Sequence, residues 1–248
     1  ETGAAVCPGR NSEPASFMAQ YFNPDPLLAH QSRSFELELL GESFRFSTDS
    51  GTFSRDRLDF GTELMLTAAL EDPAFPRQGK VLDLACGWGP VGCVLQRFLP
   101  ELSLAMSDVN PRALAAARNN LKLNAAVARS KSTATGSGKA ESLAAGEEEA
   151  TYTAAKVQLR LADGVAAWDE TFEAILLNPP IRAGKAVVYR LFAEAAAALV
   201  PGGRFYTVIR RQQGANSARR ELERLFGQTA VSDLARRAGY HVFLCLKV

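Results

Sequence analysis

Apolar runs alternate with amphipathic segments over most of the chain beyond residue 80. Strands are predicted by the runs "KVLDLA", "LSLAMSDV", "KVQLRLAD", "FEAILLN" and "GRFYTVIRR". Helical periodicity separates them at 90–99, 111–124 and 187–199, and a helix at 217–227 precedes two final strands. This order predicts an α/β fold with a doubly wound, seven-stranded, mostly parallel, Rossmann-like sheet and an antiparallel C-terminal hairpin.

The N-terminal part has a different pattern. Two alternating segments at 34–41 and 42–51 predict a β-hairpin, and a helix is expected to begin near Gly61 or Thr62. We therefore expect a hairpin and lid over 18–60 and a main domain over 61–248. Residues 1–17 lack an initiating Met and an apolar signal segment, and we expect a disordered extension there. Residues 128–150, rich in small and charged residues and without aromatics, predict a flexible insertion.

Composition narrows the class of protein. With 47% hydrophobic residues and no apolar run near the ~20 residues of a membrane span, a membrane protein is disfavoured. The net charge is only +1, but residues 204–248 hold nine Lys or Arg against three Asp or Glu. This excess fits either a solvated helical face or a phosphate-contacting surface. The cysteines lack CxxC spacing, which disfavours a disulfide framework or a metal site and favours a cytoplasmic location: Cys7, Cys86, Cys93 and Cys245.

A glycine loop follows the first strand of the main domain. In "VLDLACGWGPVG", Gly87, Gly89 and Gly92 form a literal GxGxxG, and Asp108 ends the second strand. Such a loop brings backbone amides close to a ligand, while the acid binds ribose hydroxyls. The pattern fits a nicotinamide dinucleotide or S-adenosylmethionine, and glycines needed only for strand–helix packing are the alternative.

Two further carboxylates favour S-adenosylmethionine. Asp83 lies inside the first strand, where it suits a cationic amino-acid group and would repel a pyrophosphate. Asp163 ends the third strand in "RLADG", where it can accept a hydrogen bond from an adenine amino group. An ordinary Asp-Gly turn explains Asp163 equally well.

The fourth strand ends abruptly in Asn178, Pro179 and Pro180. Ligands of open α/β sheets bind beyond the carboxyl ends of the strands, so these residues are expected at the site. The Asn178 side-chain oxygen and the Pro179 carbonyl supply two acceptors for an exocyclic amino group, and the prolines restrict their movement. This arrangement predicts methyl transfer to nitrogen.

The segments "LDLACGWGPVG", "SDVN", "LLNPPIRAGK" and "FSTDSGTFSRDRLDFGTELML" together resemble class I S-adenosylmethionine-dependent methyltransferases. They are most similar to the small-domain family of ribosomal RNA guanine-N2 methyltransferases and its single-domain bacterial relatives. The resemblance runs from about residue 21 to 248, apart from the insertion. It implies that catalysis depends on Asn178, Pro179 and Pro180. It implies cofactor contacts from Thr62, Asp83, Ala85, Cys86, Gly87, Asp108, Val109, Asp163 and Gly164. Substrate contacts are expected from Ile181, Arg182 and Phe53 at the target base, and from Lys185, whose place at a helix start suits a phosphate or a loop cap and equally a solvated lysine.

The chain departs from the family pattern at two positions. Ala85 replaces the first loop glycine, which tightens the pocket. Ile181 replaces an aromatic residue that stacks on the target base, an interaction worth ~1–3 kcal/mol per base. Arg182, Phe53 or Phe60 are candidates to stack in its place.

The leading hypothesis is an enzyme that methylates the exocyclic amino group of an RNA base, with guanine in ribosomal RNA or a ribosomal subunit as the expected partner. Arginines flanking the crevice are candidate phosphate contacts, among them Arg210, Arg211, Arg219, Arg220, Arg236 and Arg237. The alternatives are methylation of a glutamine amide in a protein, methylation of a small molecule, an NAD-dependent oxidoreductase, and a cofactor-binding protein without catalysis. The sequence leaves the oligomeric state open.

Overall fold

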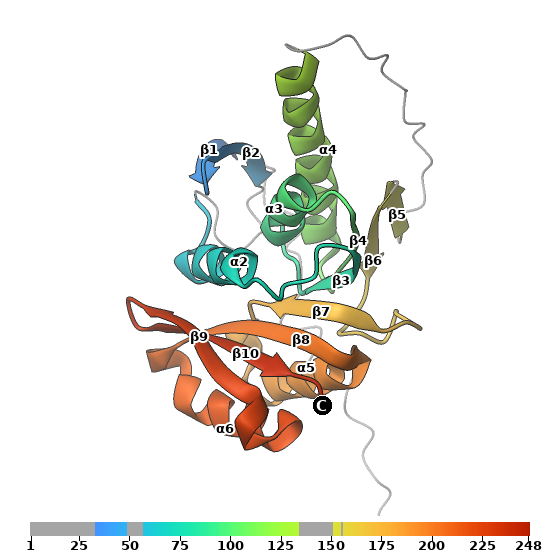
Figure 1. Ribbon diagram of the computed structural model, residues 1–248. Coiled ribbons are helices and arrows are strands. Elements are labelled where there is room, and N and C mark those ends of the chain that lie inside the picture. The colour runs from blue at the N-terminus through green and yellow to red at the C-terminus, as the bar shows by residue number, and fades with distance from the viewer. Residues whose placement is uncertain (1–32, 49–56, 134–150, 155) are drawn as a thin grey trace, which may run out of the picture.

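The computed structural model describes residues 33–48, 57–133, 151–154 and 156–248, and its main sheet has eight strands in the order β5-β6-β4-β3-β7-β8-β10-β9 (Figure 1). Strands β6, β4, β3, β7 and β8 run parallel, whereas β5, β10 and β9 pair antiparallel with their neighbours. The bounds are β3 (Gly79–Leu84), β4 (Leu102–Asp108), β5 (Thr151–Ala154), β6 (Val157–Leu161), β7 (Phe172–Leu177), β8 (Leu199–Arg210), β9 (Val231–Arg237) and β10 (Tyr240–Leu246).

The order of the strands confirms the doubly wound fold. From β3 the chain moves outward through β4 to β6, then returns to the other side of β3 for β7 and β8. The direction of winding therefore reverses between β3 and β7, and ligands of such sheets bind at this reversal, beyond the carboxyl ends of the strands.

Helices cover both faces of the sheet (Figure 1). One face carries α2 (Phe60–Glu71), α3 (Pro90–Phe98) and α4 (Pro111–Thr133), and the other carries α5 (Lys185–Ala198) and α6 (Ala215–Phe226). Strand β3 carries apolar residues on both faces because both are covered: Val81 packs into the core under α2, α3 and α4, while Leu82 and Leu84 pack into the core under α5 and α6. Short 3₁₀ turns complete the set: η1 (Ile181–Ala183), η2 (Arg211–Gln213) and η3 (Gln228–Ala230).

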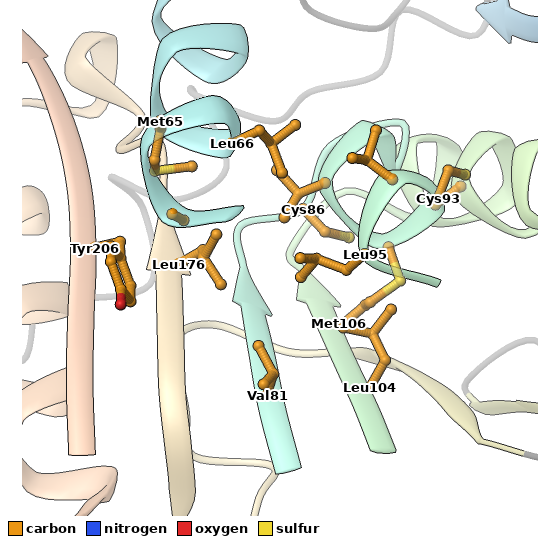
Figure 2. Close-up of a cluster of buried hydrophobic side chains, with 14 of the residues drawn as sticks. Met65, Leu66, Val81, Cys86, Cys93, Leu95, Leu104, Met106, Leu176 and Tyr206 are labelled. Carbon is orange, nitrogen blue, oxygen red and sulfur yellow. The ribbon is translucent and has the colours of Figure 1, made fainter. Parts of the chain in front are cut away.

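Figure 2 shows the core under the first group of helices. Met65 and Leu66 of α2 lie on one side of Leu176, and Cys93 and Leu95 of α3 lie over the neighbouring strands. All five side chains are buried, so α2 and α3 are fixed against the same part of the sheet. The loop that joins β3 to α3 consequently has a rigid support on both sides.

The predicted hairpin forms a separate two-stranded sheet from β1 (Arg33–Leu39) and β2 (Glu42–Thr48). Leu40 and Gly41 at its turn both have positive φ, as a two-residue turn of this twist requires. Two buried asparagines of α4 attach β2 to the main domain. Asn120 bonds both the N–H and the C=O of residue 47 (2.8 and 3.0 Å), and Asn124 does the same for residue 45 (3.0 and 2.8 Å).

The geometry of this attachment follows from the two elements. Residues four apart on a helix are separated by ~6 Å along its axis, and residues two apart on a strand by ~6.6 Å. Asn120 and Asn124 therefore match the backbone groups on one edge of β2 and act as a substitute for a neighbouring strand.

Two boundaries differ from the sequence-based expectation. Helix α4 continues to Thr133, into the range expected to be an insertion loop, because alanines and basic residues extend the helical pattern without a break. Residues Thr151–Ala154, not predicted as a strand, add β5 to the edge of the sheet by pairing with β6. Residues 1–32 and 134–150, including the expected N-terminal extension and most of the insertion, lie outside the described residues.

Candidate active site

A cavity of about 710 Å³ lies where the winding of the sheet reverses. Loops that follow β3, β4, β6 and β7 line it, together with the start of α2 and the start of β10. The structure brings most of the predicted site residues to this one cavity: Thr62, Asp83, Ala85, Cys86, Gly87, Asp108, Val109, Asp163, Gly164, Asn178, Pro179, Pro180, Ile181 and Arg182. Lys185 does not line it, and Phe53 lies outside the described residues.

The first half of the glycine loop faces the cavity. Gly87 has a φ of 56°, and a side chain added there would meet no other atom within 4 Å. Ala85 adopts a φ of 57°, a conformation that costs a non-glycine residue ~1–2 kcal/mol. The Gly87 N–H donates to Asp108 Oδ2 (2.9 Å), which ties the loop to the end of β4. At Gly87 the cavity is therefore bordered by main chain alone, and a side chain there would take up part of the space for a ligand.

The other two glycines serve packing. A Cβ on Gly89 would lie 2.8 Å from the Cβ of Ala117 in α4, and one on Gly92 would collide with the sulfur of Met106 in β4. The literal GxGxxG therefore combines one position that opens the cavity with two that permit close contact between loop, helix and sheet.

Asp83 is the most perturbed carboxyl group of the cavity. It is only 3% exposed, and among the described residues its Oδ2 has no hydrogen-bond partner. Burial raises the pKa of Asp83 to about 8, with a smaller rise from nearby Asp108 and an opposing effect from the Gly92 N–H. A buried, half-satisfied carboxyl at a ligand cavity indicates a partner that donates hydrogen bonds and carries positive charge.

Asp108 and Asp163 occupy the neighbouring strand ends. Asp108 accepts hydrogen bonds from two backbone N–H groups, and burial raises its pKa despite them. Asp163 accepts from Arg190 Nη2 (2.6 Å), and the same guanidinium also pairs with Glu194 (2.6 Å). Arg190 and Glu194 were not predicted, because they belong to α5 and strand β7 separates them from Asp163 in the sequence. The expected contact of Asp163 with adenine stays a prediction.

The Asn178 side chain is held by two residues at the start of α2. Its Nδ2 donates to Asp59 Oδ2 and to Thr62 Oγ1, both at 2.8 Å. The Thr62 hydroxyl and N–H in turn donate to the same Asp59 oxygen, each at 2.9 Å. A carboxylate only accepts hydrogen bonds, so Asp59 fixes which end of the amide faces it. The Asn178 Oδ1 is left as the acceptor of the amide at the cavity.

Asp59 was not among the predicted residues. It is the N-cap of α2, and the sequence signal is an acid placed three residues before Thr62 at a helix start. One residue therefore both caps the helix and orients the amide. Thr62, expected to touch the cofactor, bonds to Asp59 and Asn178, and its contact with a cofactor remains a prediction.

The two prolines form a tight turn rather than an irregular strand end. Pro180 has φ −73° and ψ 77°, and the Ile181 N–H donates to the Pro179 carbonyl (2.8 Å). This is an inverse γ-turn, in which the carbonyl oxygen keeps a second lone pair. The turn places Asn178, the Pro179 carbonyl and Ile181 within one short rigid segment at the cavity.

Sequence reasoning also missed an aromatic residue of the cavity. Tyr240, the first residue of β10, lines the cavity although it lies far from the other lining residues in the sequence. Lys185, expected to contact substrate, instead begins α5 and lies over the ring of Tyr189 (5.0 Å). Ile181 and Arg182 do border the cavity, as predicted.

Comparison with known proteins agrees with this fold and identifies the family. The sequence matches the methyltransferase small domain family over residues 43–137 and 129–244, so the chain belongs to that family. It is 30% identical to the uncharacterized protein YbxB of Bacillus subtilis, across 92% of this chain and 98% of that protein. It is 30% identical to the ribosomal RNA large subunit methyltransferase G of Alcanivorax borkumensis, across 82% of this chain and 44% of that protein.

Among solved structures, the 16S rRNA N2 G1207 methyltransferase RsmC of T. thermophilus, in complex with AdoMet and guanosine, superposes with a TM-score of 0.68. The two are 25% identical over 90% of this chain and 52% of that chain. The chain thus spans about half the length of these ribosomal RNA methyltransferases. Within the described residues, no helix has the length and apolar composition to cross a membrane.

Proposed function

We propose that the chain is an S-adenosylmethionine-dependent methyltransferase that acts on the exocyclic amino group of guanine in ribosomal RNA, in the cytoplasm. The observation that carries this proposal is the orientation of Asn178, because Asp59 holds the amide nitrogen and leaves the oxygen as acceptor at the cavity. An acceptor suits a target that presents N–H groups. Relatives named for ribosomal RNA methylation support RNA as the substrate class.

The residues present fit the cofactor. The unpaired oxygen of buried Asp83 suits the ammonium of its amino-acid part, and the Asp108 carboxylate suits its ribose hydroxyls. Open space beside Gly87 admits a ligand where a side chain would block it. Asp163 and Gly164 border the side proposed for adenine.

When bound, S-adenosylmethionine supplies a methyl group on a cationic sulfur. Because this sulfur leaves as a neutral thioether, the attacking amine requires no strong base. The protein's part is orientation. In the proposal, Asn178 Oδ1 accepts one N–H of the target amino group and the second lone pair of the Pro179 carbonyl accepts the other. Asp59 behind the amide makes Oδ1 a stronger acceptor and favours positive charge on the target nitrogen.

The test is transfer of tritium-labelled methyl groups from S-adenosylmethionine to undermethylated ribosomal subunits and to naked ribosomal RNA. Asn178→Ala is expected to lower transfer by about a hundredfold while cofactor affinity changes little. Calorimetry with S-adenosylmethionine and with NAD runs in parallel. Undiminished transfer by the variant would remove the catalytic assignment, and binding of NAD alone would point to an oxidoreductase. Label in a translation factor rather than in RNA would indicate a glutamine-amide substrate.

A further inference from the structure

The proposed RNA site lacks an aromatic residue at the position after the second proline, where Ile181 borders the cavity. Aromatic stacking strengthens binding of a base by about 5- to 150-fold, and an aliphatic side chain gives less. Another aromatic face at the same cavity would supply this interaction, and the described lining residues include two aromatic side chains, Trp88 and Tyr240.

Trp88 is already occupied by other aromatic rings. It is 4% exposed and packs edge-on against Phe46 (4.9 Å) and Phe35 (5.7 Å) of the hairpin. Its ring therefore belongs to the core between the hairpin and α3. Tyr240 is only half-buried and borders the cavity, so it is the aromatic ring with surface left for a ligand.

The Tyr240 ring is fixed against the residues that hold Asn178. It packs on Phe60 (5.4 Å between centroids) at the start of α2. It also lies so close to Gly61 that an added Cβ there would be 3.0 Å from the ring. Gly61 directly precedes Thr62, which bonds to Asn178. One turn of helix thus positions both the acceptor for the amino group and the aromatic ring.

Two arginines flank Tyr240 in the sheet. Its Cα pairs with that of Arg210 in β8 on one side and that of Arg237 in β9 on the other. Residues directly opposite in antiparallel strands point to the same face, so the three side chains form a row. The Arg210 guanidinium lies 5.6 Å from the Tyr240 ring centroid.

The arginines of the basic C-terminal part fall into two groups: some form ion pairs, and others, namely Arg210, Arg211, Arg220 and Arg237, form none within the described residues. Arg219, Arg224 and Arg236 form ion pairs with acids of α6 or β9. Arg210 and Arg237 are exposed, and neither has a carboxylate partner in the described part of the chain. Part of the positive charge that is not neutralised therefore lies beside the aromatic ring at the cavity.

We propose that Tyr240 stacks on the target base in place of the missing aromatic, and that Arg210 and Arg237 bind the phosphates on either side of it. The row would bind a splayed, unpaired nucleotide, with the ring on the base and the guanidinium groups on the backbone. This assignment rests on the proposed function, since it concerns the RNA substrate of the same site.

The test compares Tyr240→Leu with Tyr240→Phe, which keeps the ring. Tyr240→Leu is expected to raise KM for RNA by about tenfold or more with a smaller change in kcat, while Tyr240→Phe stays within about threefold of wild type. Ile181→Phe, added to Tyr240→Leu, is expected to recover part of the loss by restoring an aromatic face. Arg210→Gln and Arg237→Gln should each reduce the slope of log affinity against log salt by about one.

Cofactor affinity and melting temperature of each variant serve as controls for folding. Equal KM for RNA in wild type and a folded Tyr240→Leu variant would overturn the assignment. If the wild type transfers no methyl group to RNA, the proposed function fails on that result alone. The stacking role of Tyr240 is then tested by measuring affinity for single-stranded RNA oligonucleotides. If Tyr240→Leu binds them as tightly as wild type does, the stacking assignment is also overturned.

Discussion

The pKa of Asp83 leads to a specific pH dependence of cofactor binding. Burial keeps the folded pKa near 8 against an ordinary value of 3.8, so Asp83 is protonated in almost all free molecules at pH 6. The proposed partner is the ammonium group of S-adenosylmethionine, which requires the ionised carboxylate. Binding must then release a proton, and affinity must rise as the pH rises toward 8.

The magnitude follows from the fraction of ionised Asp83. With a pKa of about 8, this fraction rises about ninefold between pH 6 and pH 7, and a ligand amino group of pKa ~7.8 loses little charge over that range. The dissociation constant is expected to fall by about eightfold, or about 1.2 kcal/mol, with about 0.8 proton released per cofactor at pH 7. Above pH 8 the ligand loses its charge, so affinity reaches its maximum near that value.

Calorimetry with S-adenosylhomocysteine, which carries the same amino-acid group and is not consumed, measures both quantities. Buffers of different ionisation enthalpy give the proton count. Asp83→Asn, which has nearly the same shape, is expected to bind with an affinity that does not change between pH 6 and pH 7. A wild-type dissociation constant that varies by less than twofold over this range would refute the reasoning.

The same shift has a consequence for the free protein. The pKa of Asp83 is higher in the folded protein than in the unfolded chain. The stability contributed by protonated Asp83 is therefore fully present below the ordinary pKa of 3.8 and is lost as the pH rises through about 8. Without cofactor, the melting temperature of Asp83→Asn is therefore expected to exceed that of wild type at pH 8 and to differ little from it at pH 4. Equal differences at both pH values would show that Asp83 is ionised in the free protein.

Three further predictions concern other residues. Asp59→Asn keeps a good helix cap but no longer dictates the orientation of the Asn178 amide. The kcat is therefore expected to fall by about tenfold to a hundredfold, with cofactor affinity unchanged. Activity equal to wild type would contradict the orienting role. Asn120→Ala removes both hydrogen bonds to the main chain of residue 47 and should cost about 2–4 kcal/mol of unfolding free energy, measured by denaturant titration, whereas the exposed Arg45→Ala control should cost under about 0.5 kcal/mol. Ala85→Gly relieves a left-handed backbone and should stabilise the protein by up to about 1 kcal/mol, seen as a higher melting temperature; a lower one would mean that the Ala85 methyl group contributes packing that outweighs its strain.

The sheet was predictable because its strands are buried on both faces. Runs such as the one at β3 carry apolar residues on both faces and are separated by helical periodicity, and this pattern indicates the order of the elements. Strand β5 was not predictable, because its four residues pair at an edge and carry no distinctive apolar pattern. The end of α4 was missed for a related reason, since small and charged residues form helix and loop alike.

The site was predictable where its residues belong to motifs at strand ends. Asp83, Asp108 and Asn178 follow from their places after or within strands that converge at one edge of the sheet. Contacts between distant segments were not predictable, as the pairing of Asn178 with Asp59 shows across 119 residues of sequence. Tyr240 was missed because only the antiparallel return of β10 brings it to the cavity.

The way in which α4 holds β2 leaves two positions of the hairpin open to substitution. Asn120 and Asn124 bond the main-chain atoms of residues 45 and 47, and no side chain of those two residues takes part in these bonds. Any residue with an N–H therefore keeps both bonds at its position, whereas proline keeps only the bond to its carbonyl oxygen. The two asparagines receive the main chain of β2, while the buried side chains of Phe44 and Phe46 supply the packing, so that another hairpin of the same length can be grafted onto this domain if it keeps these two aromatic positions.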